Sequence, residues 1–179
     1  MSAAAFLVLA GTATSVLAAP VKNIVLVHGA FVDGSGWKPA YDILVKDGYS
    51  VTVVQDPLTS LEGDVAATKR ILDRQPGPCI LVGHSYGGAV ITEAGTDSHV
   101  VALVYIAAHA PEEGETEAAN GKKFPNSSKP LVKTPDGFVF LDPANFAADF
   151  AADLPREQAE FITPEPDQQT ILDYLKVRL

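Results

Sequence analysis

The sequence has few of the residues that mark several large classes of protein. Cys79 is the single cysteine, so no disulfide can form within the chain. Lys and Arg number 13 against 22 Asp and Glu, and the resulting formal net charge of −9 argues against nucleic acid as a partner. No apolar run is long enough to span a bilayer, so we expect no stable membrane association. The 179 residues are enough for one globular domain.

The first 19 residues are similar to a secretory leader. An apolar run from Ala3 to Ala10 is followed by small residues, and "VLAAP" offers cleavage after Ala18 or Ala19. No Lys or Arg precedes the apolar run, which departs from the usual pattern. We expect residues 1–19 to be a signal peptide and the protein to be secreted. The alternative is an N-terminal tail on a cytoplasmic protein.

Apolar runs and amphipathic segments alternate from Val21 to Pro111. Runs without polar alternation, typical of strands buried on both faces, predict strands at 21–29, 49–55, 78–84 and 99–111. Helical spacing predicts helices at 35–48, 60–75 and 86–96. This alternation indicates a three-layer α/β/α core over residues 20–111, with a mostly parallel sheet. Within it, the apolar surroundings of Cys79 favour a small buried side chain over a reactive thiol.

Residues 112–179 read as a cap-like loop and a helical C-terminal segment. The stretch 112–135 is rich in loop-forming residues. Asp142 and Pro143 are typical of a helix start, 155–162 is a further helical piece, and 166–179 predicts a terminal helix. No further strand is expected after the fourth.

The clearest chemical motif is Gly83-His84-Ser85-Tyr86-Gly87, which matches G-x-S-x-G between a predicted strand and a predicted helix. A serine on such a sharp turn projects its Oγ into a cleft, and the flanking glycines let the turn close. This context favours Ser85 as a nucleophile over a mere turn residue. The N–H groups of Ala30 and Tyr86 are the candidate oxyanion donors. The position of His28, close to Ala30 in the chain, favours a structural role for this residue over that of a general base.

Three stretches, "IVLVHGAFVDGSGW", "LVGHSYGGAVI" and "LVYIAAHAPEEGE", resemble the α/β-hydrolase superfamily, in its small esterase and hydroxynitrile-lyase-like branch. The resemblance covers about residues 22–115, and more loosely a cap segment at 136–155. It implies a hydrolase fold with a helical cap after the fourth strand, Ser85 as nucleophile, and oxyanion N–H groups from Ala30 and Tyr86. It also implies acyl transfer from a small-molecule ester without a cofactor or metal.

The family order of the catalytic triad is Ser, then an acid, then His, but no histidine follows His109. We therefore expect the chain to lack the last strands of the fold and both remaining triad positions. His109, after the fourth strand, is either a cleft-edge residue or a replacement base, with Glu113 or Glu112 as the acid. His99 precedes a strand, at the wrong end of the sheet. Asp33 and Asp56 are interpreted as turn residues.

Four functions compete. The first is an esterase-like serine hydrolase acting through an acyl-enzyme at Ser85. The second is a truncated isoform or pseudoenzyme that keeps the cleft but lacks the triad acid and histidine. A lyase acting on cyanohydrins would need the same histidine, and a nucleotide-binding domain would need a glycine-rich phosphate motif that is absent. The substrate and the oligomeric state are left open.

Overall fold

The computed structural model describes residues 20–116, 119, 122–123, 131–135, 137–163 and 170–171. The expected leader, residues 1–19, lies outside the described residues, and so does most of the expected terminal helix.

Four parallel strands form the central sheet, in the order β2-β1-β3-β4. They are the four predicted strands: β1 (Asn23–Val27), β2 (Ser50–Val53), β3 (Cys79–His84) and β4 (Val100–Ile106). From β1 the chain continues to β2, which pairs with one edge of β1, and then crosses to β3, which pairs with the other edge of β1. The strand order therefore reverses between β1 and β3, and this is the point at which open α/β sheets form their sites.

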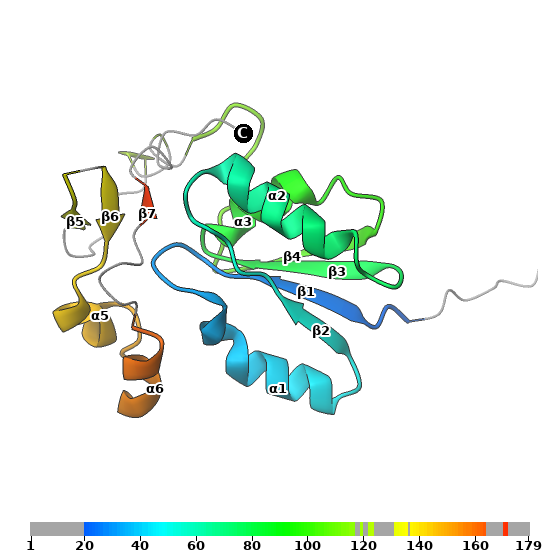
Figure 1. Ribbon diagram of the computed structural model, residues 1–179, viewed down its shortest axis with the longest axis horizontal. Helices are drawn as coiled ribbons and strands as arrows, with labels where there is room; N and C mark the ends of the chain where they lie inside the picture. The colour runs from blue at the N-terminus through cyan, green and yellow to red at the C-terminus, as the bar shows by residue number, and fades with distance from the viewer. Residues whose placement is uncertain are drawn as a thin grey trace, which may run out of the picture.

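Helices cover both faces of this sheet, which confirms the predicted three layers (Figure 1). On one face lie α2 (Leu61–Leu72) and α3 (Gly87–Ala94), and on the other lie the 3-10 turn η1 (Gly34–Trp37) and α1 (Lys38–Lys46). The predicted apolar side of α2 packs into the larger core cluster. Cys79 is fully buried and burial raises the pKa of its thiol, as expected of a structural side chain.

The region after β4 contains strands that the sequence did not predict. A small antiparallel sheet is formed by β5 (Val132–Lys133), β6 (Phe138–Phe140) and β7 (Thr170–Ile171). The expectation of no further strand was therefore wrong. These strands have two or three residues each, too few to establish a period of two in the sequence, and their pairing decides their conformation.

The last of these strands also corrects the predicted terminal helix. Thr170 and Ile171 pair with β6 in an antiparallel register, so the helix expected over 166–179 is wrong at these two positions. The two short cap helices were predicted correctly. They are α5 (Pro143–Asp149), whose Asp142 side chain accepts a hydrogen bond from the Ala144 N–H, and α6 (Arg156–Phe161).

The cap elements are placed beside the end of the central sheet at which β1 terminates (Figure 1). A second hydrophobic cluster joins them to the core, since Val32 from the loop after β1 is buried with Phe146 of α5 and Ala159 of α6. In the described part of the chain, no helix has the length and hydropathy needed to cross a membrane.

Candidate active site

The serine of the G-x-S-x-G motif lies on a strained turn between β3 and α3. Ser85 has φ +52°, in the left-handed region that costs a residue with a side chain about 1 kcal/mol or more. Its carbonyl oxygen accepts hydrogen bonds from the N–H groups of Gly88 and His109, each at 3.0 Å. The start of α3 and the loop after β4 therefore hold the turn in this conformation, as a nucleophile elbow requires.

Three glycines allow the main chain to close around this turn. A Cβ at Gly83 would lie 2.5 Å from the Gly87 carbonyl oxygen, and one at Gly87 would lie 2.6 Å from that of His28. A Cβ at Gly88 would lie 2.0 Å from the His109 carbonyl oxygen. Carbon and oxygen atoms do not approach so closely, so the motif needs glycine here for space.

The loop after β1 passes directly beside Ser85. A Cβ at Gly29 would lie 3.0 Å from the Cβ of Ser85. Ala30 comes next and is buried, and its N–H donates to no group among the described residues. Tyr86 is also buried and stands immediately before α3. Of the two expected oxyanion donors, Tyr86 follows Ser85 in the chain, and Ala30 follows Gly29, the residue that approaches Ser85.

His28 has no ring nitrogen available for a proton from Ser85. Its Nε2 accepts the Asp56 N–H at 3.0 Å, so Nδ1 carries the proton and donates to the Gly29 carbonyl oxygen at 2.8 Å. The residue is 2% exposed, and burial lowers its pKa. A neutral imidazole therefore ties the loop after β1 to the loop after β2, which is the structural role that was expected.

A buried polar cluster beneath the elbow was not foreseen. Asp64 of α2 is fully buried and accepts hydrogen bonds from the Tyr86 hydroxyl and the Leu58 N–H, both at 2.8 Å. Asp64 and Thr68 fall on the same side of α2 as Leu61 and Leu72. Polar residues on an otherwise apolar helix face are the signal in the sequence that could have indicated the role of Asp64.

Asp56 belongs to the same cluster, so its interpretation as a turn residue describes only its main chain. Its carboxyl group is buried. Burial, and next the charge of Asp64, raise the pKa of Asp56 to about 8, and neither of its carboxyl oxygens has a hydrogen-bond partner among the described residues. Asp56 is therefore protonated at neutral pH. Burial also raises the pKa of Asp64, and the hydrogen bonds from Tyr86 and Leu58 oppose that shift.

His109 and the glutamates after it lie at the carboxyl end of β4. The His109 N–H contacts the Ser85 carbonyl, and the residue is exposed. Glu112 and Glu113 are also exposed, and the Glu112 N–H is bonded to the Glu115 carboxylate at 3.0 Å. The fold thus brings the main chain of His109 to Ser85 and leaves the side chains of His109, Glu112 and Glu113 at the surface.

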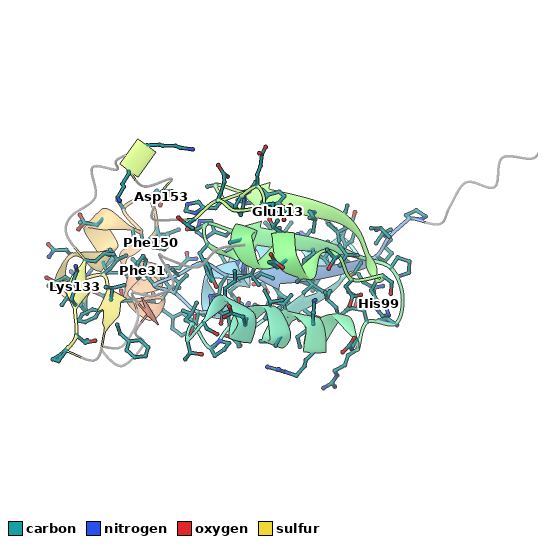
Figure 2. The ribbon with its side chains drawn as sticks, turned by 90° about the horizontal axis from the view of Figure 1, so that it is seen from above. Phe31, His99, Glu113, Lys133, Phe150 and Asp153 are labelled. Carbon is teal, nitrogen blue, oxygen red and sulfur yellow. The ribbon has the colours of Figure 1, made fainter. Side chains whose placement is uncertain are left out.

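The remaining two candidates serve local structure. Asp33 accepts the Ser35 N–H at 2.8 Å and caps η1, as its turn interpretation predicts. His99 bonds to the Asp97 carboxylate at 2.9 Å and precedes β4. Figure 2 shows His99 at the end of the core remote from Phe31, Phe150 and the cap. His99 is therefore at the wrong end of the sheet for Ser85, as expected.

Aromatic residues connect the elbow to the cap. The His84 ring lies between Trp37 and Phe150, with centroid distances of 6.3 and 6.5 Å and edge-on geometry at both. Phe150 stacks on Phe146 of α5, with centroids 5.0 Å apart. Burial lowers the pKa of His84. His84, the residue before Ser85, is therefore a neutral packing side chain that links the core to the cap.

The sequence model of the alpha/beta hydrolase family matches residues 24–178. The chain belongs to this family. No curated protein sequence matches it significantly.

Several solved structures share the fold of this α/β hydrolase. A pyrethroid hydrolase from Sphingobium faniae JZ-2 has 21% identity and a TM-score of 0.68, with 89% of this chain and 72% of that chain covered. Polyneuridine aldehyde esterase has 19% identity and a TM-score of 0.69, with coverages of 87% and 71%. Tomato methylketone synthase I, in complex with 2-tridecanone, has 18% identity and a TM-score of 0.69, with coverages of 88% and 72%.

The described residues of this α/β hydrolase provide a partly exposed serine on a strained turn, two buried peptide groups beside it and a cap above it. Such an arrangement suits a carbonyl group whose oxygen becomes negative as the serine attacks. Among these residues, no three His, Cys, Asp or Glu side chains are grouped in a way that could hold a metal ion.

Proposed function

We propose that the chain is an esterase-like serine hydrolase that cleaves a small-molecule ester at Ser85. The Ser85 Oγ forms a bond to the carbonyl carbon, its proton passes to the departing alcohol, and the carbon–alkoxide bond breaks. Water then cleaves the acyl-enzyme, which releases the acid and returns the proton to Ser85. The N–H groups of Ala30 and Tyr86 stabilise the negative oxygen of both tetrahedral intermediates.

The observation that carries this proposal is the φ of +52° at Ser85, at the point where the strand order of the sheet reverses. Backbone strain of this kind persists only where the surroundings impose it, and here three close main-chain contacts do so. Family membership, and the presence of an esterase among the similar structures, agree with ester cleavage.

We infer further that His109 accepts the Ser85 proton and that Glu113 orients it. The support is topological: both follow β4, which is hydrogen-bonded to the strand that carries the elbow. His28 and His84 are less suitable because burial lowers the pKa of both and both rings are engaged by the fold. His109 is the exposed histidine at this end of the sheet in the described part of the chain.

The test is covalent labelling with a fluorophosphonate, in which a bond from Oγ to phosphorus replaces the phosphorus–fluorine bond. We expect a single adduct on Ser85 by peptide mass spectrometry, lost in Ser85→Ala and kept in Ser98→Ala, which alters an exposed serine elsewhere. Folded protein that resists labelling, under conditions that label an esterase with a complete triad, would refute the proposal.

The alternative is a non-catalytic protein that binds a small molecule in the same cleft. The exposed positions of His109 and Glu113 favour it, because a general base normally sits in a fixed hydrogen bond to its nucleophile. Hydrolysis of p-nitrophenyl acetate separates the two. Turnover that is abolished by Ser85→Ala and lowered at least about 100-fold by His109→Ala supports the hydrolase and its proposed base. Binding without turnover supports the alternative.

A further inference from the structure

The residue after the nucleophile is anchored at both of its ends. The main chain of Tyr86 follows Ser85 directly, with φ −57° and ψ −32° at the start of α3. Its ring is packed in the larger core cluster, and its hydroxyl donates to Asp64 Oδ2 at 2.8 Å. The orientation of the Ser85–Tyr86 peptide is therefore coupled, through one rigid side chain with two torsions, to a carboxylate on α2.

Asp64 is itself held firmly, so it can act as a fixed point. Its second oxygen accepts the Leu58 N–H at 2.8 Å, and Leu58 adopts φ +52°. The helix that carries Asp64 begins at Ser60, whose side chain caps the Gly63 N–H at 3.1 Å. A fully buried carboxylate is costly unless both oxygens are bonded, and both Asp64 oxygens are. Removal of Asp64 would leave two buried donors, the Tyr86 hydroxyl and the Leu58 N–H, without an acceptor, so Asp64 fixes the position of both groups.

We propose that Asp64 is a positioning residue for the oxyanion hole. By fixing the Tyr86 hydroxyl, it sets the direction of the Tyr86 N–H at the carbonyl oxygen of the bound ester. The effect of Asp64 on the reaction rate rests on the proposed function. The effect of Asp64 on the position of the Tyr86 amide does not, and it can be tested by itself. The loss of one oxyanion donor typically lowers a rate by about 100- to 1,000-fold, so even partial misalignment is measurable.

The first measurement is the second-order rate constant of fluorophosphonate labelling at Ser85. Asp64→Asn keeps one acceptor oxygen for the two donors, the Tyr86 hydroxyl and the Leu58 N–H, and Asp64→Ala keeps none. We expect rates that fall by about tenfold in Tyr86→Phe and Asp64→Asn, and further in Asp64→Ala. Tyr105→Phe is the matched control, because it also removes a tyrosine hydroxyl from a hydrogen bond, here with Thr92 at 2.9 Å. It should label at the parent rate.

The second measurement does not depend on reactivity at Ser85. Protein labelled with ¹⁵N-tyrosine gives one amide signal for each of its five tyrosines, and the signal of Tyr86 is the one that disappears in Tyr86→Phe. In Asp64→Asn this signal should shift and exchange its proton faster with solvent, while the other tyrosine signals stay within the range seen for Tyr105→Phe.

The outcomes separate the two proposals. A moved Tyr86 amide in protein that never labels supports the positioning role and refutes the nucleophile. An unmoved amide in Asp64→Asn overturns the positioning role, whatever the labelling rate. A purely structural Asp64 would lower the melting temperature of its variants and leave both the amide signal and the labelling rate of the folded fraction unchanged. That result also overturns the proposal.

Discussion

The α-carbon of Gly88 lies directly against the carbonyl group of His109, so that a Cβ there would be 2.0 Å from the carbonyl oxygen. The N–H groups of the same two residues both donate to the Ser85 carbonyl oxygen, at 3.0 Å. Helix α3 and the loop after β4 are therefore packed main chain against main chain at Ser85. A side chain at position 88 would fit only if helix α3 or the loop after β4 moved.

Gly88→Ala is expected to displace this packing, and it should lower the free energy of unfolding by about 3 kcal/mol or more. Urea denaturation measures the change. The matched control is Gly36→Ala, because a Cβ at Gly36 meets no atom within 4 Å. Its effect should stay within about 1 kcal/mol. Equal stability of the two variants would contradict the close packing at the elbow.

The buried Asp56 should make the protein less stable at higher pH. Its pKa is about 8 in the folded chain against 3.8 ordinarily, so the folded state keeps a proton that the unfolded state loses. This contribution to stability is fully present below about pH 4, declines as the pH rises, and is exhausted above about pH 8. Four pH units correspond to at most about 5 kcal/mol. Burial also raises the pKa of Asp64, which the variant keeps, so Asp56→Asn, which cannot ionise at this position, should make the decline smaller.

The measurement is the free energy of unfolding at pH 3, 5, 7 and 9 for both proteins. Asp97→Asn is a control of opposite sign, because hydrogen bonds from the backbone and side chain of His99 lower the pKa of Asp97. The parent protein should lose the contribution of Asp97 as the pH falls, and the variant should not. If the stability of Asp56→Asn falls between pH 5 and 9 as much as that of the parent protein, Asp56 is not the source of the decline.

Strand β4 should promote self-association. It is one of the two edge strands of the central sheet, and Val101, Val104 and Ile106 are 55%, 40% and 44% exposed. An exposed apolar edge strand pairs readily with other chains. Val104→Lys should shift the sedimentation distribution toward the monomer. Ile43→Lys changes a residue on α1 that is 61% exposed, and it should not alter the distribution. The same distribution for both variants would rule out β4 as the contact.

The leader predicted from the sequence has a direct test. We expect protein recovered from the medium of a secreting host to begin at Ala19 or Pro20, as determined by N-terminal sequencing. Intracellular protein that still begins at the first residues would contradict both the cleavage and the secretion.

Much of the core could be predicted because its signals are local and strong. Continuous apolar runs marked β1 to β4, and the spacing in "SLEGDVAATKRIL" marked α2. The elbow was also visible, since G-x-S-x-G stood between a strand and a helix. The strands of the cap escaped prediction because a two-residue strand exists only through its partner. The role of Asp64 escaped it because Tyr86 is 22 residues away in the sequence.

The sequence by itself determined the alternation of strands and helices, the place of Ser85 between them and the glycines around it. These features follow from hydrophobic periodicity and from the steric limits of individual residues. Only the tertiary structure decided which buried groups meet: Asp64 with the Tyr86 hydroxyl, the His28 ring with the Asp56 N–H, and Gly88 with the His109 carbonyl. The physical reason is that a hydrogen bond or a close contact depends on distance in space, and the chain sets that distance only when its layers have packed.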